Sequence, residues 1–444
     1  MKKTQIVLLL ILSNSIFAQI TLKGHIIDKT DQEAIPGAHI FLASNVQIYT
    51  VSNTEGDFTL KLPKINQKKE VIIVSHVGYD SVKIPAKKFA QFQGRVKIPL
   101  DNQKLQEVTL NLNERTTKAR KILNEVIRKY RINFPKKKYF LNGVYREAIK
   151  QNNKYLLLVE SLLALEDFGI NKTSLNNKFH LQYLKKWNFL KLNKEEKQRL
   201  NQLEQNGLDR ILSNDFIRNQ NLSKSSKRNP IINNSLLKIY EPFLNKTITQ
   251  SGIPIHFISL TPKSEPYKEF ETEFNIIVDG NEHVIQVLYF GFKPKKTATN
   301  LKKYSTQHLG NNYYFKRVTI KYKKNGDFWY PYYQTVREPL NISNPSLARN
   351  NFTSFKDFFV NSISSSPLYS KSRLIDKNEP IYTYKEQGEL IDWHNANKVE
   401  DIEILRNVKK DIQKEINAKN TSKQKIKDEL KKLKRQLIFI NNKI

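Results

Sequence analysis

The stretch KGHIIDKTDQEAIPGAHIFL, residues 23–42, is followed by TVSNTEGDFTLKLP, residues 50–63, and by EVIIVSHVGYDSVKI, residues 70–84. Short segments of alternating apolar and polar residues are separated by Gly, Pro, Asn or Asp, which favour turns. This pattern is typical of a small β-sandwich. We predict its strands at Lys23–Asp28, Ala38–Leu42, Gln47–Ser52, Phe58–Leu62, Val71–Ser75, Ser81–Ile84 and Arg95–Leu100.

The same region resembles the carboxypeptidase regulatory-like domain, a transthyretin-like sandwich. Three marks carry the resemblance: a hairpin, a turn before a Phe, and a closing segment with Gly and an aromatic residue. They are Gly24, Ile26, Asp28, Ile35, Pro36, Gly37, Ala38 and Ile40; then Ser52, Asn53, Gly56 and Phe58; and then Val74, Ser75, Gly78 and Tyr79. The resemblance implies a non-catalytic accessory domain at residues 19–112.

The first residues predict export. Lys2 and Lys3 precede a short apolar run, and small residues lead to Ala18, so residues 1–18 fit a secretory signal peptide. The chain contains no cysteine, which excludes disulfides, thiol chemistry and cysteine-ligated metals. We therefore expect an exported protein of the periplasm or the outer membrane, with no transmembrane span after cleavage.

The chain of 444 residues has a formal net charge of +33. Such a charge favours anionic envelope components as partners. The lysines are spread along the chain together with many Asn and Ile residues, so base composition of the gene is an alternative explanation. No nucleic-acid-binding motif occurs, and we expect no nucleic-acid partner.

The middle of the chain, residues 113–395, predicts a helix followed by a β-rich body. Apolar residues at helical spacing run from Thr116 or Thr117 to Ile132. Strands are expected at Tyr139–Ile149, Ile255–Thr261, Glu271–Val278, Glu282–Phe290, Tyr313–Tyr322 and Trp329–Arg337. The segment Lys154–Leu165 fits a strand or a helix. Residues 171–248, rich in Lys, Asn, Leu and Gln, predict a helical insertion.

Two further resemblances concern this body. The string Tyr139 to Glu147 with Leu158 to Leu163 looks like the body of exported carboxypeptidase-regulatory-like proteins of Gram-negative bacteria whose function is uncharacterised. Here Val144 and Ser161 replace the usual Phe and Ala. Gly326 to Pro331 is similar to a strand of lipoprotein-carrier-like half-barrels, which hold acyl chains beneath a helical lid. These resemblances imply a half-barrel-like body.

Arg146 is the candidate ligand-binding residue of this body. Inside a half-barrel its guanidinium would bind a phosphate or carboxylate head group. The alternative is structural: Arg146 and Glu147 point to opposite faces of a strand, and one of them pairs across the sheet.

The last part, residues 396–444, predicts an antiparallel helical hairpin or coiled coil. Apolar residues from Ile402 to Ile416 share one helical face, and those from Ile426 to Ile444 follow a heptad-like spacing. The polar stretch 417–422 is expected to break the two helices. The lysine-rich faces leave two alternatives, packing within the protein and contact with an anionic membrane surface.

No motif of a known catalytic or nucleotide-binding site occurs, and no histidines are spaced as metal ligands. A glycoside hydrolase needs a pair of carboxylates, and Glu147, Glu160 and Glu166 are candidates. Their spacing in the sequence gives no support for a catalytic pair. We expect no catalytic residue, cofactor or metal.

The sequence thus predicts a mainly β, non-enzymatic envelope protein that uses its sandwich to dock another envelope protein. The alternative is a periplasmic carrier that binds a lipid or acyl chain in its body.

Overall fold

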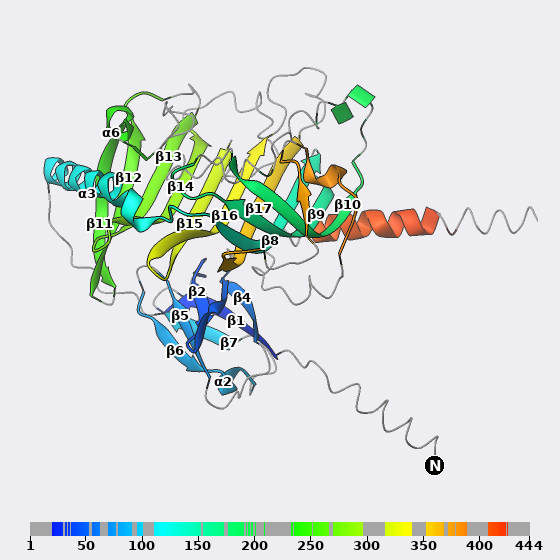
Figure 1. Cartoon of the computed structure of the whole chain (residues 1–444), viewed down its shortest axis with the longest axis horizontal. Helices are drawn as coiled ribbons and strands as arrows, with labels where there is room; N and C mark the ends of the chain where they lie inside the picture. Colours follow the sequence, from blue (N-terminus) through cyan, green and yellow to red (C-terminus); the bar gives the residue numbers. More distant parts are fainter. Residues whose placement is uncertain are drawn as a thin grey trace, which may run out of the picture.

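The computed structural model describes residues 20–100, 111–200, 208, 232–295, 316–339, 352–388 and 407–424, with short gaps inside these ranges. The fold is mainly β, with two small N-terminal sheets, one antiparallel sheet of 11 strands and few helices (Figure 1). The predicted signal peptide lies outside the described residues. Within the described part, no helix is long and apolar enough to cross a membrane.

The N-terminal sandwich has its own core. One sheet contains β4 (Asp57–Leu62), β1 (Ile20–Asp28) and β7 (Val96–Leu100), and the other contains β3 (Asn45–Val51), β2 (His39–Leu42), β5 (Val71–Ser75) and β6 (Val82–Pro85), with the short helix α2 (Lys87–Ala90) before β7. Ile26, Ile40, Phe58, Leu60 and Val74 are buried between the sheets. All seven predicted strands are therefore confirmed. Gly56 has φ +75°, as the predicted turn requires.

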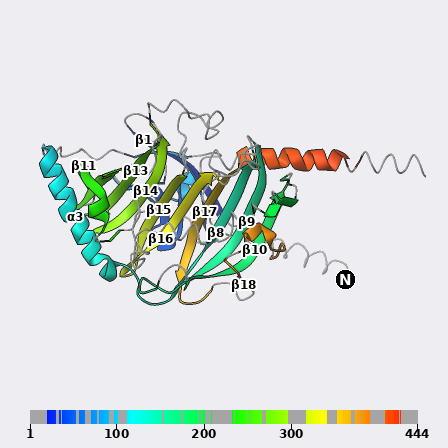
Figure 2. The same ribbon diagram turned by 90° about the horizontal axis from the view of Figure 1, so that it is seen from above.

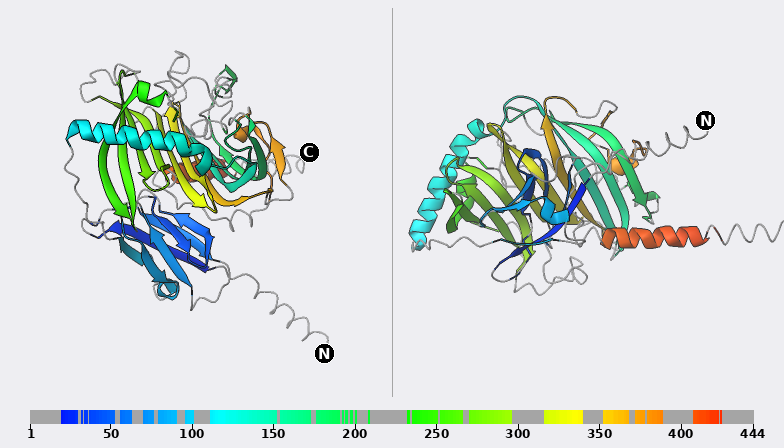
Figure 3. Two further views of the ribbon diagram at one scale, coloured as in Figure 1. Left: turned by 60° about the vertical axis from the view of Figure 1, so that its left-hand side comes forward. Right: turned by 90° about the horizontal axis from the view of Figure 1, so that it is seen from below.

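The large sheet holds most of the remaining chain. Its strands, in spatial order, are β11 (Tyr240–Gln250), β12 (Ile253–Pro262), β13 (Phe270–Asp279), β14 (Val284–Pro294), β15 (Lys316–Asn325), β16 (Phe328–Pro339), β17 (Phe352–Ser364), β8 (Tyr139–Gln151), β9 (Lys154–Asp167), β10 (Lys178–Asn188) and β18 (Arg373–Ile375). A short turn of helix, η6 (Ile381–Thr383), follows β18. Over the described residues β11 and β18 form the two edges, so the sheet is open, and it is strongly curved (Figures 2 and 3).

The helix α3 (Leu112–Asn133) lies against the β11 end of this sheet (Figure 2). Asn111 caps it: its side chain accepts a hydrogen bond from the Glu114 backbone, and Glu114 accepts one from the Asn111 backbone. The predicted start at Thr116 or Thr117 was thus a few residues late. Ala119, Ile122, Leu123 and Val126 are buried against the sheet. We call the sheet face that α3 covers the inner face, and the opposite face the outer face.

The predicted helical insertion at 171–248 is wrong in part, because it contains β10 and most of the large sheet's edge strand β11. Helical residues occur between 194 and 200, and α6 (Leu236–Ile239) precedes β11. The segment Lys154–Leu165 is a strand, since it lies within β9. β10 was not predicted because the connection from β9 is longer than a tight hairpin turn and its other partner, β18, lies far along the chain.

The C-terminal region differs from the predicted hairpin. Residues 407–422 are helical throughout, so the expected break at 417–422 does not occur in the described residues. Val408 and Ile412 pack on Ala148, Leu158 and Phe355 of the outer face. The Tyr155 backbone N–H donates to Asp411, and Lys154 pairs with Glu415. Residues 425–444, the predicted second helix, lie outside the described residues.

Figure 1 shows the sandwich beside the large sheet. Aromatic residues of β2 and β3 make the contact with the outer face. Tyr49 contacts the rings of Tyr332 and Phe359, and its hydroxyl donates to the Val360 carbonyl. His39 also contacts the ring of Tyr332. These contacts place the sandwich behind the strands β16 and β17.

Two lysines of β15 lie in this sandwich–body joint. Lys323 Nζ is 4.1 Å from the centre of the Tyr49 ring and donates to the Val46 carbonyl. Lys321 is 7% exposed beside Gly37, and no hydrogen bond or ion pair to its ammonium occurs among the described residues. Burial lowers the pKa of both lysines from 10.5 to about 8. Burial of the charged Lys321 ammonium in this joint therefore lowers the stability of the folded protein.

We expect Lys321→Met to stabilise the protein at pH 7 and to reduce its pH dependence above pH 8. Between pH 8 and 10.5 the unfolded chain holds more protons at Lys321 than the folded chain, so stability from this group rises with pH. Urea unfolding of wild type and variant at pH 7, 8, 9 and 10 measures the difference. A variant that is less stable than wild type at pH 7 would show that the ammonium has a favourable partner.

Candidate functional site

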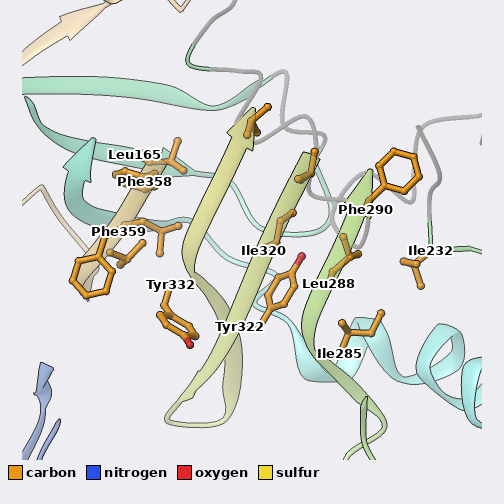
Figure 4. Close-up of a cluster of buried hydrophobic side chains, with 14 of the residues drawn as sticks. Leu165, Ile232, Ile285, Leu288, Phe290, Ile320, Tyr322, Tyr332, Phe358 and Phe359 are labelled. Atoms are coloured by element: carbon orange, nitrogen blue, oxygen red, sulfur yellow. The ribbon is translucent and has the colours of Figure 1, made fainter. Parts of the chain in front are cut away.

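The inner face of the large sheet is apolar along most of its width. Figure 4 shows Leu288, Phe290, Ile320 and Phe358 as part of one cluster of buried side chains drawn from β14, β15 and β17. The cluster continues through Leu141, Tyr145 and Ile149 of β8 and through Leu157, Val159, Leu163 and Leu165 of β9. Their neighbours in sequence point to the outer face, as the two-residue period of a strand requires.

Parts of the predicted insertion cover this face. Leu200, Leu208, Ile232 and Leu236 are buried in the same cluster, and Figure 4 shows Ile232 beside Ile285 and Leu288. Ile232 therefore packs on the inner face, the face that α3 also covers.

Charged residues interrupt the apolar pattern at one point, where β8 pairs with β17. β8 carries Arg146 and Glu147, and β17 carries Lys356 and Asp357. The antiparallel register places Arg146 opposite Asp357 and Glu147 opposite Lys356. Because adjacent residues of a strand face opposite sides, each face receives one acid and one base.

On the outer face Arg146 and Asp357 form a buried ion pair. Each residue is 1% exposed, and the guanidinium binds both carboxylate oxygens, with Nε–Oδ1 at 3.0 Å and Nη2–Oδ2 at 2.6 Å. Two parallel hydrogen bonds of this kind are the strongest arrangement available to the pair. Glu160 lies opposite Arg146 on β9, and Lys409 of the C-terminal helix is 3.8 Å from it. The geometry fits the structural interpretation of Arg146, which pairs across the sheet and faces away from the apolar cluster.

On the inner face Glu147 and Lys356 are both buried within the apolar cluster. Lys356 Nζ is 4.0 Å from Glu147 Oε1 and donates to Ser354 Oγ at 2.5 Å. The Tyr145 hydroxyl donates to Glu147 Oε2 at 2.7 Å. Acid and base balance, so this polar group has no net charge. An apolar replacement of a buried ion pair is often as stable, so this pair is not needed for stability alone.

Two uncharged side chains lie on the same face, in the row of residues next to Glu147 and Lys356. Gln334 of β16 is 1% exposed between Ile320 and Phe358, and neither its amide oxygen nor its amide nitrogen has a hydrogen-bond partner among the described residues. Ser161 of β9 is fully buried opposite Tyr145, and its hydroxyl also lacks a hydrogen-bond partner within the described part of the chain. An unsatisfied buried amide or hydroxyl costs about 1–3 kcal/mol. Sequence reasoning missed Gln334 and Lys356; a charged pair inside the apolar string SFKDFF was the available signal for Lys356.

The carboxylates considered from the sequence do not converge. Glu147 faces the inner side, whereas Glu160 and Glu166 face the outer side of β9. Glu166 accepts from His180 at 2.9 Å and pairs with Lys138. Among the described residues no cluster of three or more His, Asp or Glu side chains is arranged to hold a metal ion.

Solved structures similar to this chain include a DUF1329 family protein from Desulfovibrio piger, a LolA superfamily protein from Nitrosomonas europaea, and an outer membrane lipoprotein-sorting protein domain, described as putative, from Vibrio parahaemolyticus. They share 12%, 13% and 10% sequence identity with TM-scores of 0.23, 0.22 and 0.23. Each match covers 57% of this chain and 95%, 96% and 95% of the respective neighbour. TM-scores this low carry no argument about activity. A comparison with curated proteins found no significant match.

The family comparison concerns the N-terminal part. The model of the CarboxypepD_reg-like domain matches residues 22–110, which span all seven strands of the sandwich. The three sequence marks and the two packed sheets lie in this range. Residues 22–110 are therefore a CarboxypepD_reg-like domain, joined to a body of eleven antiparallel strands.

Proposed function

We propose that this protein is a non-enzymatic carrier of the cell envelope that holds an apolar chain, such as an acyl chain, on the inner face of its large sheet. The observation that carries the proposal is the wide apolar surface on the inner face of an open, curved sheet, which extends on both sides of a few buried polar residues. Burial of each methylene there would contribute ~0.8 kcal/mol. The predicted signal peptide supports an envelope location.

In the proposed arrangement the sandwich packs on the outer face of the sheet, opposite the face that holds the apolar chain. Its β2 and β3 strands are engaged with the protein's own outer face through Tyr49 and His39. This contact favours the carrier over the docking function predicted first, because part of the expected docking surface is occupied within the chain. Its other surfaces are left for an envelope partner.

Native mass spectrometry of protein purified from the envelope of a Gram-negative host tests the proposal. We expect a species heavier than the polypeptide that loses a lipid on activation. Leu288→Trp, which adds volume to the inner face, should reduce the occupied fraction. Tyr289→Trp, the adjacent outer-face change on β14, is the matched control and should not. Detection of the bare polypeptide alone, or equal occupancy in both variants, contradicts the carrier.

A further inference from the structure

The inner face contains a polar belt across its apolar surface. Gln334, Lys356, Glu147 and Ser161 come from the neighbouring strands β16, β17, β8 and β9 and are all buried. Gln334 and Ser161 lie in one row with Phe358 and Tyr145 between them. With strands ~4.8 Å apart, the belt extends over about 14 Å.

We infer that this belt is a binding site for the uncharged polar head group of a lipid, with hydroxyl and carbonyl groups as in a glycerol ester. The inference rests on the proposed function, since the apolar chain would lie on the surface on either side of the belt. It identifies the ligand as amphipathic and names the side chains that select it.

The unsatisfied groups set the chemistry of the head group. The Gln334 amide offers one acceptor and two donor hydrogens, and the Ser161 hydroxyl offers both roles, so together they match a ligand with donors and acceptors. Apolar neighbours on both sides, Ile320 and Phe358, supply nothing to Gln334. A bare alkyl chain would leave both groups unsatisfied.

The ion pair of the belt argues against a charged head group. Glu147 already balances Lys356 at 4.0 Å, and the carboxylate also accepts from Tyr145. A fatty-acid carboxylate placed here would leave a net negative charge in an apolar surrounding, which is strongly unfavourable. An uncharged ester or hydroxyl avoids this cost.

Competition for an apolar dye, N-phenyl-naphthylamine, tests the inference on the full-length protein. Monopalmitoylglycerol, palmitate and hexadecane share one chain length and differ in the head group. We expect monopalmitoylglycerol to displace the dye at a concentration about tenfold lower than the other two, as one well-placed buried hydrogen bond would give. Gln334→Leu should remove this preference.

Further variants separate the site from a packing effect. Gln334→Leu should also raise the unfolding temperature of the ligand-free protein, because it removes an unsatisfied amide. Ser161→Ala, a smaller change, should reduce the preference without affecting the fold. Thr335→Val, next to Gln334 but on the outer face, is the control and should behave as wild type.

The experiment distinguishes an error in the head-group site from an error in the proposed carrier function. If neither dye nor any lipid binds the wild-type protein, the proposed function is wrong. If all three lipids compete equally in wild type and Gln334→Leu, or if palmitate competes best, the carrier stands and the head-group site is overturned.

Discussion

Arg146→Met is expected to lower the free energy of unfolding by about 3–5 kcal/mol, because it leaves the Asp357 carboxylate buried without its base. The methionine side chain fills much of the guanidinium's space, so the loss is chiefly electrostatic. Equilibrium urea unfolding followed by far-ultraviolet circular dichroism measures it.

The double variant Arg146→Met with Asp357→Leu is expected to recover most of that stability, since neither charge is then left unpaired. Arg128→Met is the surface control. Arg128 pairs with Glu125 on the solvent-exposed side of α3, and its loss should change the free energy of unfolding little. A ligand-binding Arg146 would behave differently, with a small stability loss in the single variant and no recovery in the double.

Gly143→Ala is expected to be similarly damaging to the body. A Cβ at this position would lie 2.2 Å from the Phe359 carbonyl oxygen and 3.0 Å from the Val360 Cα, both backbone atoms of β17. The strands β8 and β17 would have to separate at the centre of the sheet, and we expect a loss of about 3 kcal/mol, at the upper end of measured overpacking effects. Thermal unfolding monitored by circular dichroism is the measurement.

Gly326→Ala is the control that tests whether the loss at Gly143 comes from the close contact with β17 or from replacing any glycine in the sheet. Gly326 has φ +59° in the β15–β16 turn, but no heavy atom lies within 4 Å of its added Cβ, so only backbone strain of ~1 kcal/mol applies. Equal losses at the two positions would show that close approach of β17 is not the cause at Gly143.

The sandwich could be predicted from the sequence because its signals are local. Each strand is short, alternating and bounded by a turn, and Gly56 marks the sharpest of them. The strands β12, β13 and β14 of the body could be predicted for the same reason, because each pairs with the next strand in the chain. The strand β17 was not predicted: it pairs with β16 and with β8, and the β8 partner is more than 200 residues away in the chain.

The candidate site was predictable only in part. Arg146 and Glu147 stood out as charges in an apolar strand, and their alternate directions followed from strand geometry. Their partners could not be identified, because the register of β8 on β17 is a property of the whole sheet. Gln334 gave no signal at all, since a lone Gln in a strand is ordinarily solvent-exposed; only its burial in the folded sheet makes it notable.

The pairing of β8 with β17 also bears on the order in which the chain acquires its structure during synthesis and export. β8, β9 and β10 emerge early, but β8 must wait with one edge open until β17 has emerged, some 200 residues later. An open apolar edge invites aggregation, and inward-pointing charges are a known protection against it. Arg146 and Glu147 place such charges on this edge. They also disfavour one slipped register, because a shift by one residue would bring Arg146 opposite Lys356.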